Sequence, residues 1–152
     1  MCKVYLGIGS NLGDKKLNLK TAVEEISELA ILKKVSEIYH SKAWGYQSKN
    51  DFMNQVVLIE TKLQNDELFF KLKEIEQKAG RITTNKGYTD RILDIDILFI
   101  GNQIFDTSFL TIPHPKLHLR KFVLEPLLEL EDIYHPVLKK KISVLLKEIK
   151  QE

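Results

Sequence analysis

The sequence predicts a single domain that contains both β-strands and α-helices, and three observations indicate this. The chain has 152 residues, of which 43% are apolar and 29% charged, as in an ordinary globular domain. Residues 91–100 form a nearly continuous run of β-branched and large apolar side chains, which is typical of a buried strand. Apolar residues recur at helical spacing over 17–30 and again over 68–79. Strands and helices therefore alternate, although no Rossmann-type βαβ series follows from the pattern.

The charge and cysteine content exclude several classes of protein. The net charge is +2, from 23 basic and 21 acidic residues, which is too balanced to indicate nucleic acid or a membrane surface as a partner. The single cysteine, Cys2, excludes an internal disulfide and a structural zinc site and fits a reducing compartment. No segment approaches the ~20 apolar residues of a membrane span. We therefore expect a cytoplasmic protein that binds neither nucleic acid nor a membrane.

The first elements follow from periodicity and turn residues. Residues 3–8 are predicted to form a strand that enters the glycine-rich segment 7–14. The spacing G-x-G-x-x-x-G differs from a dinucleotide fingerprint, so we predict a tight strand-to-helix connection with Asp14 at or near the helix N-cap. After that helix, a strand is predicted at residues 31–39 and a loop at 40–50.

The next strand, at residues 52–62, carries a polar group and a ring on one face. Side chains alternate along a strand, so Phe52 and Asn54 point the same way. An aromatic ring offers a stacking surface, and a carboxamide offers both a donor and an acceptor. This pair suits a flat heterocycle with polar edges; a core phenylalanine beside an asparagine at the strand end is the alternative.

A second helix and a polar segment follow. The helix begins near Gln64, and Gly80 is its predicted C-terminal stop, with Glu76 at the edge of the apolar stripe. Residues 81–91 are polar and have no apolar period. A loop of this kind next to a functional strand could close over a ligand, and a plain connecting loop is the alternative.

Asp94 and Asp96 interrupt the otherwise apolar strand at residues 91–100. They lie on the same face, about 7 Å apart at about 3.3 Å of rise per residue. Two carboxylates on an apolar strand repel each other unless a cation lies between them. Mg²⁺ is commonly held by one or two carboxylates together with substrate phosphates. The pair therefore predicts a phosphoryl-transfer site; two solvated aspartates on an exposed strand face are the alternative.

Turn signals organise the end of the chain. Gly101-Asn102 is predicted to form a two-residue hairpin turn that leads into a short strand at residues 103–105. Helices are predicted at residues 122–130 and 142–149.

Two prolines flank His114 and hold its backbone extended, so the imidazole is presented rigidly. Arg120 follows closely, and an arginine can bind a phosphate through two hydrogen bonds. Together these two side chains make a plausible phosphate clamp.

Five segments, taken in order, resemble the 6-hydroxymethyl-7,8-dihydropterin pyrophosphokinase family of the folate pathway. These segments are residues 5–14, 51–54, 91–98, 113–115 and 120–127. The likeness covers nearly the whole chain, which we expect to be one domain over residues 1–152. The resemblance implies an α+β fold, with a ferredoxin-like antiparallel sheet and helices packed on it. It also implies transfer of pyrophosphate from ATP to the hydroxymethyl group of the pterin, with release of AMP. We expect the protein to be a monomer.

The resemblance assigns roles to particular positions of this sequence. The metal ligands, which hold Mg²⁺, would be Asp94 and Asp96. The catalytic residues would be Arg81, Arg91, Asp94 and Asp96. ATP would contact Arg81, Arg91, Ile97, Thr111, His114 and Arg120. The pterin would contact Ser41, Lys42, Trp44, Phe52, Asn54 and Phe122, with the ring between the two phenylalanines.

The chain departs from the family at two places. The family's loop between the two arginines is usually rich in Arg and Lys and ends in Trp-Gly-Pro, whereas residues 82–90 contain Thr83, Thr84 and Tyr88 instead. Lys86 is the candidate replacement for a charge, and Tyr88 for the ring. Phe109 lies where some members have an arginine that contacts ATP.

Two other functions compete with this interpretation. Nucleotidyltransferases also carry a D-x-D strand with two metals, but a Gly-Ser turn normally lies just ahead of it, whereas Gly9-Ser10 lies far upstream. A single-stranded RNA-binding module could use Phe52 as a stacking platform. That module would leave the aspartates unexplained, because without a metal they repel phosphate.

Overall fold

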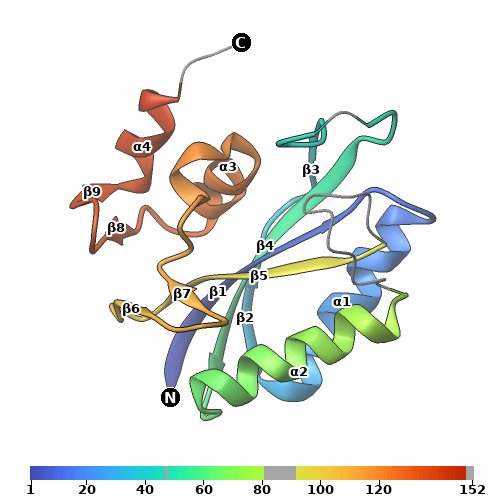
Figure 1. Ribbon diagram of the computed structural model, residues 1–152, viewed down its shortest axis with the longest axis horizontal. Helices are drawn as coiled ribbons and strands as arrows, with labels where there is room; N and C mark the ends of the chain where they lie inside the picture. The colour runs from blue at the N-terminus through green and yellow to red at the C-terminus, as the bar shows by residue number, and fades with distance from the viewer. Residues whose placement is uncertain (47, 81–91, 150–152) are drawn as a thin grey trace.

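An antiparallel sheet organises the fold in the computed structural model, which describes residues 1–46, 48–80 and 92–149 (Figure 1). Its strands are β1 (Cys2–Ser10), β2 (Ile31–Val35), β3 (Tyr39–Ser41), β4 (Phe52–Thr61) and β5 (Asp94–Ile100). The strand order is β2-β4-β1-β5, and β3 pairs with the beginning of β4. All of these pairs are antiparallel. Strand β1 is therefore central, and β5 lies at an edge.

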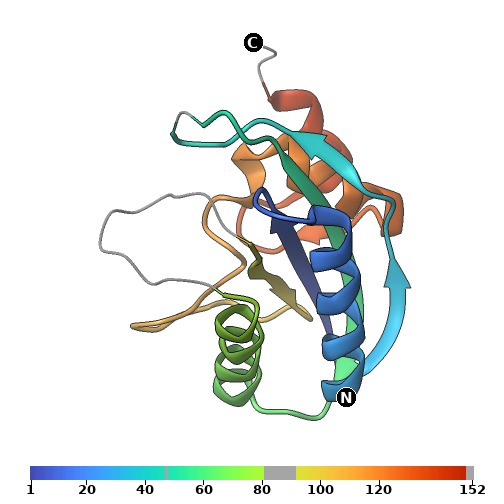
Figure 2. The same ribbon diagram turned by 90° about the vertical axis from the view of Figure 1, so that its right-hand side faces the viewer.

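Helices cover both faces of this sheet (Figures 1 and 2). The first pair is α1 (Lys15–Leu29) and α2 (Asn65–Lys78), and the second pair is α3 (Lys121–Leu130) and α4 (Ile142–Glu148). The apolar stripes of α1 and α2 pack against one face, as the helical spacing predicted. Residues of α3 and α4 pack against the other face. In the part of the chain that the structure describes, no helix is long and apolar enough to cross a membrane.

The predicted hairpin after β5 is wrong in its pairing. The turn itself forms, since the Gln103 backbone N–H donates to the Ile100 carbonyl at 3.0 Å. The next strand, β6 (Phe105–Asp106), pairs with β7 (Thr111–Ile112) rather than with β5. The reason is local, because Thr107 and Leu110 close a separate hairpin between β6 and β7 through their backbones and the Thr107 hydroxyl.

The predicted strand at residues 31–39 is split into β2 and β3. Ser36 interrupts it, because its hydroxyl accepts a hydrogen bond from the Val56 backbone N–H at 2.9 Å and replaces a regular ladder contact. The predicted loop at residues 40–50 consequently begins only after Ser41. The N-cap prediction is confirmed, since the Asp14 carboxylate accepts from the Leu17 backbone N–H at 3.2 Å.

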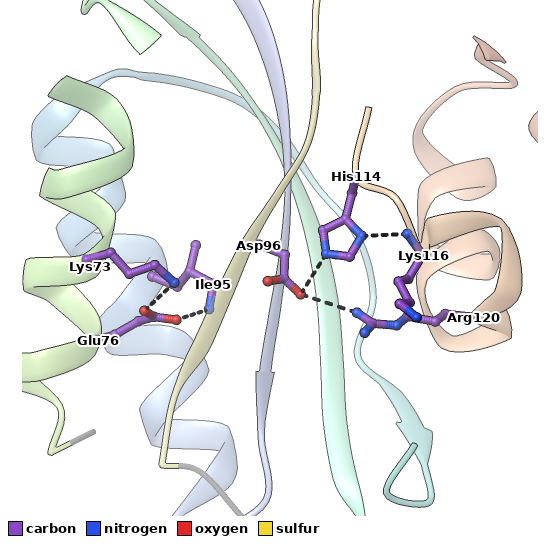
Figure 3. Close-up of polar contacts among 7 residues, drawn as sticks. All are labelled: Lys73, Glu76, Ile95, Asp96, His114, Lys116 and Arg120. Atoms are coloured by element: carbon purple, nitrogen blue, oxygen red, sulfur yellow. Dashed lines mark hydrogen bonds and ion pairs between the residues drawn. The ribbon is translucent and has the colours of Figure 1, made fainter. Parts of the chain in front are cut away.

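Short elements complete the C-terminal part. They are a 3-10 helix, η1 (Leu117–Leu119), and a small two-stranded sheet of β8 (Tyr134–His135) and β9 (Lys140–Lys141). The segment between β7 and α3, which includes η1, passes beside β5 (Figure 3). The His114 backbone N–H donates to the Leu98 carbonyl at 3.0 Å. This contact attaches residues far apart in the sequence to the strand that carries the two aspartates.

Candidate active site

A cavity of about 360 Å³ lies on the face of the sheet that α3 covers. Residues of β1, β4, β5, α3 and two loops line it. Four of its side chains are aromatic rings, Trp44, Tyr46, Phe52 and Phe122. We call this space the first cavity. The prediction that Phe52 and Asn54 share a face is confirmed, since both line it.

Two glycines of β1 form part of the lining. Gly7 and Gly9 are two residues apart in the strand, so both lack a side chain on the same face. A Cβ atom at Gly9 would lie 3.2 Å from Asn54 Oδ1 and 3.4 Å from a ring carbon of Phe52. Gly9 was predicted in the strand-to-helix connection, but it lies inside β1 together with Gly7. Glycines at alternate positions of a strand are the signal for a surface left open to a ligand.

Asn54 is fixed by its neighbours. Its side-chain Nδ2 donates to the Tyr39 carbonyl at 3.2 Å and to the Ser41 hydroxyl at 2.8 Å. Both acceptors belong to β3, so this short strand orients the carboxamide. Ser41 therefore acts on the site through Asn54. Lys42 is exposed in the loop after β3, and its predicted contact with a substrate stays a prediction.

The two aspartates of β5 lie on the face predicted for them. Asp94 and Asp96 both line the first cavity. Asp96 also lines a second cavity of about 390 Å³, which runs beside the free edge of β5. Ile97, Thr111 and His114 line this second cavity as well. The two cavities thus meet at Asp96, His114 and Pro115, which line both.

Asp96 lies in a charged cluster (Figure 3). Its Oδ2 atom is 3.5 Å from Nη1 of Arg120 and 3.9 Å from Nε2 of His114. Burial and the neighbouring Asp94 carboxylate raise the pKa of Asp96 to about 7, although the charges of Arg120 and Lys73 oppose this rise. Asp96 therefore resists ionisation at this position unless additional positive charge is present.

His114 is neutral at pH 7. Burial and the nearby Arg120 charge lower the pKa of His114 to about 4. Its Nδ1 atom accepts a hydrogen bond from the Lys116 backbone N–H at 3.1 Å, which leaves Nε2 as the protonated nitrogen (Figure 3). The site thus holds a neutral donor here, so the 3.9 Å approach to Asp96 is not an ion pair.

Arg120 lies between the aromatic wall and the aspartates. Its side chain is only 10% exposed, and its guanidinium carbon is 4.6 Å from the centre of the Trp44 ring and 6.0 Å from that of Phe122. Its Nε atom is buried, and it has no hydrogen-bond partner among the described residues. Such a donor suits an anionic ligand that enters between the two cavities.

The donor groups of the site fit Mg²⁺. Among residues 1–46, 48–80 and 92–149, no group of three or more His, Cys, Asp or Glu side chains could enclose a metal ion. The site instead presents two carboxylates beside cavities large enough for substrates. Two carboxylates match the coordination preference of Mg²⁺, which usually binds one or two carboxylates and completes its octahedral coordination with phosphate oxygens and water.

Several predicted residues fall outside the described part of the chain. They are Arg81 and Arg91, together with the loop at residues 82–90. The remaining predicted residues divide between the two cavities, apart from Ser41 and Lys42. Residues that line the cavities but did not follow from the sequence include Tyr46, Gln55, Lys73, Lys116 and Val123. Only the folded arrangement brings these residues beside the aspartates.

Comparisons with known proteins identify one family. The family model for 7,8-dihydro-6-hydroxymethylpterin-pyrophosphokinase (HPPK) matches residues 5–132. The 2-amino-4-hydroxy-6-hydroxymethyldihydropteridine pyrophosphokinase of Aquifex aeolicus (strain VF5) is 40% identical over 153 aligned residues, covering 100% of this chain and 92% of the relative. The enzyme of the same name from Haemophilus influenzae is 39% identical over 132 residues, covering 86% and 82%.

Solved structures share the fold. The chain superposes on the crystal structure of an HPPK-DHPS in complex with substrates with a TM-score of 0.71. The sequences are 16% identical, and the match covers 96% of this chain and 43% of the solved one. The chain thus spans less than half of that longer protein.

Proposed function

The chain belongs to the 7,8-dihydro-6-hydroxymethylpterin-pyrophosphokinase family, and on this premise we propose how its residues divide the work of the reaction. It transfers a pyrophosphoryl group to the hydroxymethyl group of 6-hydroxymethyl-7,8-dihydropterin in folate biosynthesis, with ATP as the donor. One observation supports the assignment most strongly: two cavities of different lining meet at Asp96.

The first cavity is the proposed pterin site. Phe52 and Phe122 supply the apolar surfaces that a flat bicyclic ring requires, and Trp44 adds a third ring. Asn54 is held by β3, so its carboxamide can meet the polar edge of the ring without first being ordered. The missing side chain at Gly9 keeps this carboxamide accessible.

The second cavity is the proposed ATP site. Ile97, Thr111 and His114 line it beside the free edge of β5, at the positions that the family resemblance assigns to the nucleotide. At the junction of the cavities, Arg120 and the neutral His114 would contact the triphosphate. Asp94 and Asp96 would hold Mg²⁺, which would neutralise phosphate charge when bound.

The reaction follows from this arrangement. The pterin hydroxyl oxygen attacks the β-phosphorus of ATP, the bond between that phosphorus and the α,β-bridging oxygen breaks, AMP leaves, and the hydroxyl proton is released to solvent. The barrier is set mainly by charge and alignment. Arg120 therefore acts by stabilising negative charge, and the two cavities act by holding the hydroxyl and the phosphorus in line.

We also propose that the fold is ferredoxin-like. The chain order β1-α1-β2-β4-α2-β5 and the antiparallel pairing of neighbouring strands support this. That the chain is a single domain, acts as a monomer in the cytoplasm and has no nucleic-acid partner stays a prediction.

Product analysis tests the proposed reaction. The protein is mixed with Mg²⁺, ATP and 6-hydroxymethyl-7,8-dihydropterin, and the phosphorus products are resolved by ³¹P NMR. We expect AMP and a diphosphorylated pterin in equal amounts. Pyrophosphate with a nucleotidylated pterin would indicate a nucleotidyltransferase instead, and ADP with a monophosphorylated pterin would indicate an ordinary kinase.

A further inference from the structure

Glu76 is a fully buried carboxylate that the mechanism above does not use. The sequence predicted it at the edge of the α2 stripe, but it is 0% exposed. Its Oε2 atom accepts a hydrogen bond from the Ile95 backbone N–H at 2.7 Å, and its Oε1 atom lies 3.0 Å from Nζ of Lys73 (Figure 3). A buried carboxylate is tolerated only with such partners, so its presence calls for a role.

The hydrogen bond fixes the strand that carries the aspartates. Ile95 lies between Asp94 and Asp96, and β5 is an edge strand. Its backbone N–H is bonded to Glu76 of α2. Glu76 thus joins α2 to the segment that contains both proposed metal ligands.

Lys73 connects this buried contact to the second cavity. It lies one turn before Glu76 on α2, its side chain is 31% exposed, and it lines the cavity together with Asp96, Thr111 and His114. Its Nζ atom is 5.3 Å from the centre of the Phe69 ring, which also lines the cavity. The Lys73 ammonium group therefore contacts the buried Glu76 carboxylate on one side and borders the second cavity on the other.

Lys73 and Asp96 line the same cavity, from α2 and from β5. The ammonium group therefore brings positive charge to the space where the phosphates of a nucleotide would lie.

We propose that Lys73 is a further nucleotide-binding residue that contacts the phosphates of ATP, and that Glu76 is its positioning residue. This inference rests on the proposed function of the second cavity as the ATP site. The buried Glu76 carboxylate restricts the Lys73 side chain to few rotamers. Less conformational entropy of that side chain is therefore lost when a phosphate binds. The competing explanation is that Lys73 only neutralises Glu76.

A double variant separates these explanations. Lys73→Met alone would leave Glu76 charged and buried, which could unfold the protein. Combining Lys73→Met with Glu76→Gln removes both charges, and the glutamine carbonyl can still accept from Ile95. The matched control is Lys71→Met, because Lys71 lies on the same helix but outside the residues that line the second cavity.

The measurement is calorimetric titration with α,β-methylene ATP in Mg²⁺ and, separately, with 6-hydroxymethylpterin. We expect the double variant to bind the nucleotide about tenfold more weakly, as for a lost hydrogen bond to a charged group, and to bind the pterin as the wild type does. Lys71→Met should leave both affinities unchanged. Restoring the charge in Lys73→Arg, with Glu76 intact, should bring nucleotide affinity back to within a few-fold of the wild type.

Equal nucleotide affinity in the double variant and the wild type would overturn the role of Lys73. Parallel losses of nucleotide and pterin affinity would overturn it too, because a displaced β5 alters both cavities. If the wild type itself bound no α,β-methylene ATP, the assignment of the second cavity as the ATP site would be refuted, and the role of Lys73 with it.

Discussion

At the scale of a single residue, the Asp96 carboxyl lowers the stability of the metal-free protein. Burial and Asp94 raise the pKa of this carboxyl from its usual 3.8 to about 7. Between these two values the folded chain holds a proton at Asp96 that the unfolded chain has released. The free energy of unfolding of the metal-free protein therefore falls, on account of this group, as the pH rises through that window.

Asp96→Asn should consequently stabilise the metal-free protein and abolish turnover. An amide carries no charge, so the variant avoids repulsion with Asp94 but loses a metal ligand. At pH 8 in EDTA we expect a gain of about 1 kcal/mol, or about 3 °C in Tm, by scanning calorimetry. Near pH 4 the gain should vanish.

Asp132→Asn is the comparison of opposite sign. Hydrogen bonds from the Ser143 hydroxyl and backbone N–H lower the pKa of Asp132, so this substitution should destabilise at pH 8. If Asp96→Asn lost stability at pH 8 as Asp132→Asn does, the repulsion between the two aspartates would be refuted.

Phe122→Ala tests the assignment of the first cavity. Removing the ring takes away an apolar wall, so affinity for 6-hydroxymethylpterin should fall at least about tenfold, or about 1.4 kcal/mol. Affinity for α,β-methylene ATP should change less than about threefold, because Phe122 does not line the second cavity. Fluorescence titration of each ligand measures both. Tyr134→Ala, at an exposed ring on β8, is the control, and equal losses for the two ligands would refute the division.

At the scale of elements, strand β1 shows what an alternating pattern can reveal. Its paired positions on β4 and β5 carry side chains, whereas Gly7 and Gly9 leave one face open. The strand was predictable from its apolar residues, and glycines at alternate positions signal an opening. Which residues border that opening was not predictable, because register is a long-range property.

Gly9→Ala should weaken pterin binding severalfold while the protein remains folded. The new Cβ would lie 3.2 Å from Asn54 Oδ1 and would displace the carboxamide or the Phe52 ring. Gly7→Ala should have a smaller effect, because its nearest new contact is an ordinary 3.6 Å to Leu98. Circular dichroism confirms folding, and pterin titration ranks the variants. The reverse ranking would contradict this role of Gly9.

The same contrast explains which elements the sequence predicted. The helices, β1 and β4 follow from local periodicity, and the capping residue Asp14 marks the start of α1. The pairing of β6 with β7 and the burial of Glu76 do not, because each depends on contacts between segments far apart in sequence or on competing turns. The predicted binding residues followed largely from family resemblance rather than from periodicity.

At the scale of the whole molecule, one face of the sheet serves the hydrophobic core, and the other face also carries the candidate active site. One face is filled by α1 and α2, and α3 and α4 pack on the other (Figure 2). The first cavity lies on that second face, beside the core that α3 and α4 form. The free edge of β5 adds the second cavity. Asp96 lines both cavities, so its carboxylate is close to both the proposed pterin site and the proposed ATP site.

Metal binding tests this arrangement most directly. Mn²⁺ accepts the same oxygen ligands as Mg²⁺, and electron paramagnetic resonance distinguishes free from bound Mn²⁺. In the presence of α,β-methylene ATP, the wild type should bind Mn²⁺ beyond what the nucleotide binds alone, and Asp96→Asn should lose this additional binding while retaining its affinity for the pterin. Unchanged Mn²⁺ binding in Asp96→Asn would contradict the placement of the metal between the two cavities.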